Sequence, residues 1–289
     1  MIYRLLAINL DGALLSSKGR VHRLTKLALE EVKDKEVEIA LYTKFSYQHA
    51  LKMAKMLPFK THIIANQGGY ITNNSNEPIL NKRISESTAL DIVRLLESMD
   101  CYIRVIHENF TLANTLQFPS EIASKIKWTT GDYTFYTQQY VESLTEHMLL
   151  DAIAPLQIDV YFEQDSDHIE VIDAIHSLFS NISIHCEKDG KMTILPEQVS
   201  LQNGLLALLE QLNIELAKTV VIGCHEADNE MVESAGLGIA LANAEMTTKN
   251  VADWITRSND GLGVAYAARE VFRKQQQLSF LKRIKNENY

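Results

Sequence analysis

The sequence reads Leu5-Leu6-Ala7-Ile8-Asn9-Leu10-Asp11-Gly12-Ala13-Leu14 near its start. Four apolar residues, the length of a short strand, run into a polar turn. A polar loop follows, and then an amphipathic stretch from Thr25 to Lys33. This order predicts a strand, a loop and a helix, with the polar turn at the carboxyl end of the strand.

The same order recurs along the first part of the chain. The apolar run Val37–Tyr42 ends at Thr43 and is followed by a helical pattern, and Ile63-Ile64-Ala65 ends at Asn66-Gln67-Gly68-Gly69. Apolar strands that alternate with helices are typical of βαβ units and a parallel sheet, whose ligand-binding loops follow the carboxyl ends of the strands. We therefore expect an α/β protein with a Rossmann-like parallel-sheet core.

The pattern changes in the middle of the chain and then returns. From about residue 82 to residue 189, helices alternate with strands in the manner of a smaller α+β unit. Strand patterns of the parallel type reappear at Thr219–Gly223 and Leu237–Ala242, and Asn203-Gly204 before them predicts a loop. The chain is therefore expected to form a core from residues 1–81 and 190–289, with an inserted domain at 82–189.

The polar strand ends resemble known motifs. The stretch Asn9–Leu14 resembles the D-x-D-G-T-L signature of the haloacid dehalogenase-like superfamily, and the insertion lies where the Cof-type phosphatase branch carries its α+β cap. Further segments resemble later motifs of that family in the correct order: Thr43, Asn66-Gln67-Gly68, Gly223–Asp228, Ile239–Ala244 and Ser258–Gly261.

The resemblance implies a phosphatase mechanism and a role for each motif position. In the family the first Asp attacks phosphorus to give an aspartyl phosphate, and the second Asp acts as general acid and base. Magnesium is held by the first Asp, by the backbone carbonyl of the second and by an Asp of the last motif. A Thr and a Lys bind the remaining phosphoryl oxygens.

Several of these positions carry a different residue in this chain. Asn9 stands at the nucleophile position, Leu201 at the phosphate-binding Lys position, and Cys224 at the metal-binding Asp position. Ala13 and Ala227 replace a Thr and an Asn of the motifs. A neutral amide is a poor nucleophile, so the family route of covalent catalysis is expected to fail.

Other positions of the motifs are retained. Asp11 stands at the acid/base position, and its backbone carbonyl stands at one of the metal positions. Thr43 and Asn66 stand at phosphate-binding positions. Asp228 supplies one metal-binding carboxylate. Lys44 could replace the missing Lys or be solvated. Asp228 could act as a base or brace its neighbours by accepting backbone hydrogen bonds, which we favour. We expect magnesium, the cofactor of the family, to bind weakly or not at all.

Cys224-His225-Glu226 allows two interpretations. These three side chains could form a replacement site for a transition metal, since Cys, His and Glu all ligate such ions. Adjacent side chains at a strand end seldom converge on one ion, however. We favour a buried Cys224 that fills the space of the missing Asp, with His225 and Glu226 in solvent.

Three functions remain open. The leading hypothesis is a non-catalytic protein, regulatory or stress-related, that binds a small phosphorylated ligand between core and cap. The alternative is a magnesium-dependent phosphatase of sugar phosphates or nucleotide-type cofactors, which the resemblance implies. The third is an interaction protein that uses the cap or the basic tail after Arg273, with its protein partner unknown.

Composition limits the partners and the location. The net charge of -9 disfavours nucleic acid, which attracts Lys and Arg. The absence of a long apolar run predicts no membrane span, and the first residues lack a signal-peptide pattern, so we expect a cytoplasmic protein. The three cysteines are far apart and odd in number, which predicts reduced thiols.

Overall fold

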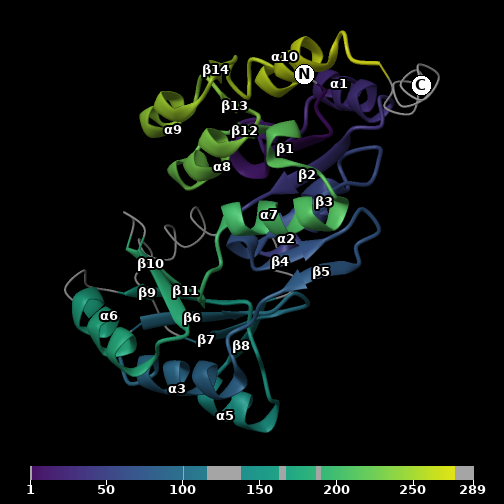
Figure 1. Cartoon of the computed structure of the whole chain (residues 1–289). Helices are drawn as coiled ribbons and strands as arrows, with labels where there is room; N and C mark the ends of the chain where they lie inside the picture. Colours follow the sequence, from purple (N-terminus) through teal and green to yellow (C-terminus); the bar gives the residue numbers. More distant parts are fainter. Residues whose placement is uncertain (1, 100, 116–137, 163–166, 187–189, 277–289) are drawn as a thin grey trace. The chain divides into compact units, whose positions relative to one another are not determined.

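The computed structural model describes residues 2–99, 101–115, 138–162, 167–186 and 190–276 (Figure 1). The chain divides into two compact units. The first holds the residues up to Lys44, Ala50–Leu80 and those from Leu201 on, and the second holds Phe45–His49 and Asn81–Ser200.

The first unit is built on an eight-stranded sheet in the order β14-β13-β12-β1-β2-β3-β4-β5. The strands from β14 to β3 run parallel, and β4 is antiparallel to β3. The predicted parallel-sheet core is therefore confirmed. The strands are β1 (Leu5–Asn9), β2 (Glu38–Tyr42), β3 (His62–Ala65), β4 (Tyr70–Thr72), β5 (Pro78–Asn81), β12 (Thr219–Gly223), β13 (Leu237–Ala240) and β14 (Trp254–Ile255).

Helices cover this sheet. Leu5 and Ala7 of β1 belong to the same buried cluster as Leu205 and Leu208 of α7, while the alternating residues Leu6 and Ile8 are also fully buried. A parallel strand buried on both faces has a continuous apolar sequence, which explains the run at the start of the chain. The helices are α1 (Arg23–Lys33), α2 (Tyr47–Ala54), α7 (Leu201–Leu212), α8 (Asn229–Ser234), α9 (Met246–Val251) and α10 (Gly263–Phe272).

Helix α7 begins earlier than the sequence indicated. The pair Asn203-Gly204, expected in a loop, lies inside this helix. A Cβ added at Gly204 would lie 2.9 Å from the Cα of Gly68, so the missing side chain lets the helix approach the turn after β3. Gly204 therefore serves close packing, which local turn signals do not distinguish from a loop.

The second unit has a six-stranded sheet in the order β10-β11-β9-β6-β7-β8. Its helices α3, α5 and α6 lie on one face of that sheet, where they form a shared apolar core with β6, β9 and β11 (Figure 1). The elements are α3 (Glu86–Leu96), β6 (Cys101–Ile106), β7 (Thr111–Asn114), β8 (Gln138–Val141), α5 (Leu144–Leu150), β9 (Gln157–Phe162), α6 (Asp167–Leu178), β10 (Ile182–Cys186) and β11 (Lys191–Pro196).

The second boundary differs from the one expected. The sequence predicts a return to the core at residue 190, but the chain up to Ser200 belongs to the second unit. The physical reason is that β11 pairs with β10 and with β9, so it completes the second sheet. The part of the basic tail at 277–289 lies outside the described residues.

Two further findings concern the whole described chain. Among the described helices, none combines the length and the apolar character that crossing a bilayer requires. Cys101, Cys186 and Cys224 are free thiols, as expected.

Candidate active site

The polar residues singled out in the sequence gather at the carboxyl edge of the first sheet. Asn9 is the last residue of β1, Thr43 follows β2 and Cys224 follows β12, and these three strands are neighbours and parallel. Asn66 follows β3, the next strand along. Asp11 lies in a single π-helical turn, Leu10–Leu14, directly after β1.

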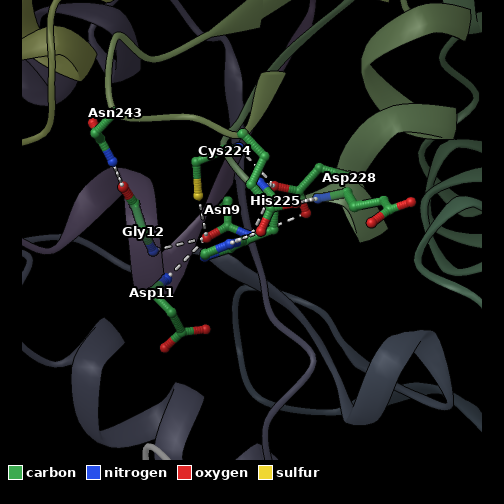
Figure 2. Close-up of polar contacts among 9 residues, drawn as sticks. Asn9, Asp11, Gly12, Cys224, His225, Asp228 and Asn243 are labelled. Carbon is green, nitrogen blue, oxygen red and sulfur yellow. Dashed lines mark hydrogen bonds and ion pairs between the residues drawn. The ribbon is translucent and has the colours of Figure 1, made fainter. Parts of the chain in front are cut away.

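Asn9 is held by hydrogen bonds on both ends of its amide (Figure 2). Its Nδ2 donates to Oδ1 of Asp228 at 3.0 Å and to Oδ2 at 3.1 Å. Its Oδ1 accepts from the backbone N–H of Asp11 at 3.0 Å and of Gly12 at 3.1 Å, with the Sγ of Cys224 3.6 Å away. The side chain is only 4% exposed, so the amide is oriented by the protein and has little access to solvent.

Asp228 is fully buried and closes the loop after β12. Its Oδ2 accepts from the backbone N–H of Cys224 at 2.7 Å and of His225 at 3.0 Å, besides the bond from Asn9. Burial raises the pKa of Asp228, against the lowering effect of these hydrogen bonds. These contacts are the ones that a bracing role of Asp228 requires.

Cys224 behaves as a small apolar residue. It is 1% exposed and packs in a cluster with Ala240 and Ala244. Burial, reinforced by the carboxylates of Asp228 and Asp11, raises the pKa of the Cys224 thiol well above its usual value, so the sulfur stays protonated at neutral pH. A neutral thiol is a weak ligand for any cation, because the thiolate is the form that binds metal.

His225 and Glu226 do not point to a metal site with Cys224. Both are exposed, and the Nδ1 of His225 lies 3.6 Å from the Oε1 of Glu245. Among the residues that the structure describes, no three His, Cys, Asp or Glu side chains form a group that could hold a metal ion.

Asp11 and Thr43 form a second pair in the site. The hydroxyl of Thr43 donates a short hydrogen bond to Oδ2 of Asp11. Thr43 is fully buried, whereas Asp11 and the following Lys44 are half-buried. Of the two retained motif carboxylates, Asp11 and Asp228, that of Asp11 is therefore the more accessible. Lys44 directly follows Thr43 in the sequence.

Leu201 and Asn66 are placed by packing. Leu201 is the first residue of α7 and belongs, at 5% exposure, to the apolar cluster that contains Leu205 and Ile64. The position of the family's Lys is thus part of the hydrophobic core. Asn66 is fully buried with a left-handed backbone, φ 50°, and its carbonyl accepts from the N–H of Gly69 at 3.0 Å.

Two asparagines to which sequence reasoning gave no site role connect the loops. The Nδ2 of Asn243 donates to the carbonyl of Gly12 at 3.1 Å, and its Oδ1 accepts from the N–H of Asn259 at 2.8 Å. The Nδ2 of Asn259 donates to the carbonyl of Leu15 at 3.0 Å. Both lie in segments that matched late motifs, and that match was the signal that could have assigned them to the site.

The donor set does not fit a magnesium ion. Mg²⁺ prefers oxygen ligands, commonly one or two carboxylates, in octahedral geometry. Asn9 offers an amide oxygen that already accepts two N–H groups, and both oxygens of Asp228 accept from the Asn9 amide. Cys224 offers a protonated sulfur. The backbone carbonyl of Asp11, at the third metal position, brings no charge.

Comparison with known proteins places these features in one family. The family model described as haloacid dehalogenase-like hydrolase matches residues 6–267. The chain is 38% identical over 281 residues to the stress response protein YhaX of Bacillus subtilis, covering 97% of both chains. It is 25% identical to the phosphatase YwpJ of the same organism, covering 93% of this chain and 99% of that one.

The fold agrees with solved structures. A haloacid dehalogenase-like hydrolase from Bacteroides thetaiotaomicron matches with a TM-score of 0.80 at 20% identity, over 93% of this chain and 100% of that one.

Proposed function

The chain belongs to the haloacid dehalogenase-like hydrolase family, and we propose that it is a member that no longer transfers phosphoryl groups and acts by binding a small ligand. Its role is regulatory and related to stress, in line with the name of its relative in Bacillus subtilis. Its site differs from what a phosphatase of this family needs.

One observation carries this proposal: the side chain of Asn9 donates to Asp228 at 3.0 and 3.1 Å. An amide has neither the charge nor the nucleophilicity of a carboxylate. Both ends of the amide are occupied by hydrogen bonds, so the group is fixed where the family places its nucleophile. Asn9 therefore has a structural role in the proposed site and no role as a nucleophile.

The metal and phosphate positions support the same conclusion. The hydrogen-bonded Asn9 and Asp228 and the protonated Cys224 are a poor set for Mg²⁺. The apolar Leu201 supplies no cation for a phosphoryl oxygen. Loss of a single stabiliser of this kind costs roughly 10²- to 10³-fold in rate. Several losses together leave no useful turnover.

The ligand is proposed to contact the accessible part of the site. Asp11 and Lys44 are the half-buried motif residues that offer polar groups beside the buried Asn9 and Asp228. A small phosphorylated molecule remains the proposed ligand, because the ammonium group of Lys44 is suitable for a phosphate oxygen. Its affinity should be modest, since the site also holds the carboxylate of Asp11.

The test compares the natural protein with a repaired one. The repaired form carries Asn9→Asp and Cys224→Asp, and a second form adds Leu201→Lys. Each is titrated with Mg²⁺ by calorimetry and assayed with p-nitrophenyl phosphate and a panel of phosphorylated metabolites. We expect the natural protein to show neither metal binding nor turnover, and the repaired forms to gain both. Turnover by the natural protein that Asp11→Asn abolishes would overturn the proposal.

A ligand-binding readout completes the experiment. Phosphorylated metabolites that raise the melting temperature of the natural protein without being hydrolysed support binding, because a ligand that binds only the native state stabilises it. The variant Lys44→Gln should reduce this rise, because it removes the ammonium group proposed to contact the phosphate.

The second candidate is the phosphatase that the relatives suggest. It is favoured by one observation, the retained and half-buried Asp11, whose carboxyl group is of the type that acts as general acid and base. The phosphatase YwpJ is 25% identical to this chain. The same assay separates the two functions.

A further inference from the structure

The second unit contains a cavity of about 590 Å³ whose lining shares no residue with the candidate active site. Its volume is in the range of small-molecule sites in proteins. All of its lining residues come from the second unit, so it does not depend on the sheet that carries Asn9. The lining consists of Arg83, Glu86, His107, Phe110, Leu112, Gln139, His147 and the segment 151–154.

Hydrogen bonds hold the segment before α3, which contains the lining residue Arg83. Arg83 donates from one terminal nitrogen to the carbonyl of Ala154 at 2.8 Å and forms a short ion pair with Glu108 through the other. The neighbouring N–H of Ile84 donates to the carbonyl of Pro155 at 2.9 Å. These bonds tie the segment before α3 to the segment after α5. The walls are therefore held in place without a ligand.

The turn between β6 and β7 supplies a flat wall. The backbone N–H of His107 donates to the carbonyl of Phe110 at 2.9 Å, and their rings stack at 4.6 Å with an interplanar angle of 11°. The Nδ1 of His107 lies 3.0 Å from Oε2 of Glu108. Burial lowers the pKa of His107, so the ring is neutral at physiological pH. Together with Leu112 and Ile153, the turn presents an apolar and aromatic surface.

Helix α5 and the residue that follows it supply polar groups of the lining. Its first residues are anchored by Glu97, which accepts from the N–H of Leu144 at 2.6 Å and of Thr145 at 3.1 Å. His147 and Asp151 lie one helical turn apart, and the N–H of Asp151 donates to the carbonyl of His147 at 3.0 Å. Both residues line the cavity. The sequence alone assigned no role to His147.

The charges of the lining are unbalanced. The cation of Arg83 is paired with Glu108, which compensates it locally. Glu86 and Asp151 are exposed carboxylates of the lining, and the neutral ring of His107 adds no positive charge. The cavity therefore combines an apolar wall with a surplus of negative charge, a combination that attracts a cation carried on an apolar body.

We propose that this cavity binds a small organic amine, with its apolar or aromatic body against Phe110, Leu112 and Ile153 and its ammonium group beside Glu86 and Asp151. This site is separate from the one under the proposed function. The occupant is a protonated amine because the lining offers two carboxylates and its guanidinium is already paired.

The experiment uses three probes that share one ring system and differ only in charge. Tryptamine is cationic, tryptophol is neutral and indole-3-acetate is anionic at pH 7.5. Each is titrated into the full-length natural protein and followed by calorimetry and by ligand-observed NMR. We expect tryptamine to bind at least fivefold more tightly than tryptophol, and indole-3-acetate to bind most weakly.

Two variants test whether the binding occurs in this cavity. Glu86→Gln with Asp151→Asn removes both carboxylates and should weaken tryptamine at least fivefold, with little effect on tryptophol. Ala152→Leu reduces the volume and should weaken both probes. The control Glu146→Gln changes an exposed carboxylate on α5 outside the lining and should leave all three affinities unchanged.

The outcomes decide the proposal. A preference for tryptamine that is lost in the double variant and kept in the control supports it. Equal binding of the three probes, stronger binding of indole-3-acetate, or no binding of tryptamine at millimolar concentration overturns it. Asn9→Asp should leave tryptamine binding unchanged, so this result is independent of whether the proposed function holds.

Discussion

The amide nitrogen of Asn9 lies 3.0 Å from one carboxylate oxygen of Asp228 and 3.1 Å from the other. The two residues are 219 positions apart in the sequence and both are buried, so this contact connects the end of β1 with the turn that follows β12. A neutral donor facing a buried carboxylate is stabilising, because the charge is satisfied without a counter-ion. A carboxylate at position 9 would not allow this arrangement without a proton or a metal ion.

Restoring the acid at position 9 should therefore destabilise the protein. In Asn9→Asp, two carboxyl groups about 3 Å apart cannot both ionise, so one pKa rises above its unfolded value. The expected loss is about 3 kcal/mol at pH 8, from breaking a buried polar pair. Since a carboxyl whose folded pKa is raised contributes stability below its unfolded pKa that is lost as pH rises, the variant should recover toward pH 5.

The measurement is urea unfolding of the natural protein and of Asn9→Asp between pH 5 and pH 8. Asn9→Ser is the control, because it removes the amide without adding charge and should show a weaker pH dependence than Asn9→Asp. Equal stability of Asn9→Asp and the natural protein at pH 8 would contradict the role given to the Asn9 bond with Asp228.

Much of the site's location could be predicted from the sequence. Apolar runs that end in polar turns place Asn9, Thr43, Asn66 and Cys224 after parallel strands, and parallel strands present their carboxyl ends at one edge. The order of these four segments along the chain is enough to predict that the four residues lie at the same edge of the sheet.

The contacts inside the site could not be predicted in the same way. The orientation of the Asn9 amide depends on Asp228 and on two backbone N–H groups, which come together only in three dimensions. The start of α7 was also missed, because Gly204 is placed by its 2.9 Å approach to Gly68 and not by a local turn. Strand β11 was assigned to the wrong unit because its sequence suits either sheet.

A second prediction concerns the close approach of the first turn to Cys224. A Cβ added at Gly12 would lie 2.3 Å from the Sγ of Cys224 and 2.7 Å from Nε2 of His225. The thiol is buried and cannot move away easily, so Gly12→Ala should cost about 1–3 kcal/mol of unfolding free energy.

A double-mutant cycle checks this cause. Cys224→Ala removes the sulfur, so the cost of Gly12→Ala should fall by at least half in the Cys224→Ala background. If the cost stays the same, the clash is with another group and the account of this contact is wrong.

A third prediction concerns pH and the partners of Glu38. The hydrogen bond from His62 and the ammonium of Lys33 lower the pKa of Glu38 from 4.5 to about 2. A carboxyl whose folded pKa is lowered contributes stability above its unfolded pKa, which is lost as pH falls toward its folded pKa. Glu38→Gln should therefore reduce stability by about 1–2 kcal/mol at pH 6 and by much less near pH 2.

Thermal unfolding between pH 6 and pH 2 provides the readout. The exposed Glu233→Gln is the matched control and should change stability little across this window. A loss in Glu38→Gln that is the same at pH 6 and at pH 2 would contradict the assignment.

The last prediction concerns Leu201, whose position has been absorbed into the core of the first unit. The side chain is 5% exposed and packs in the cluster that contains Leu205 and Ile64. Leu201→Lys would bury an ammonium among apolar side chains, so we expect a loss of about 2–4 kcal/mol in unfolding free energy, whereas Leu201→Met should cost less than about 1.5 kcal/mol. A form that also carries Asn9→Asp and Cys224→Asp has two new carboxylates in the site. The ammonium group introduced by Leu201→Lys can pair with them only if its side chain points toward the site. A smaller loss from Leu201→Lys in that background, measured by denaturant unfolding, would show that the lysine reaches them. An equal loss in both backgrounds would show that this position is now a core position alone.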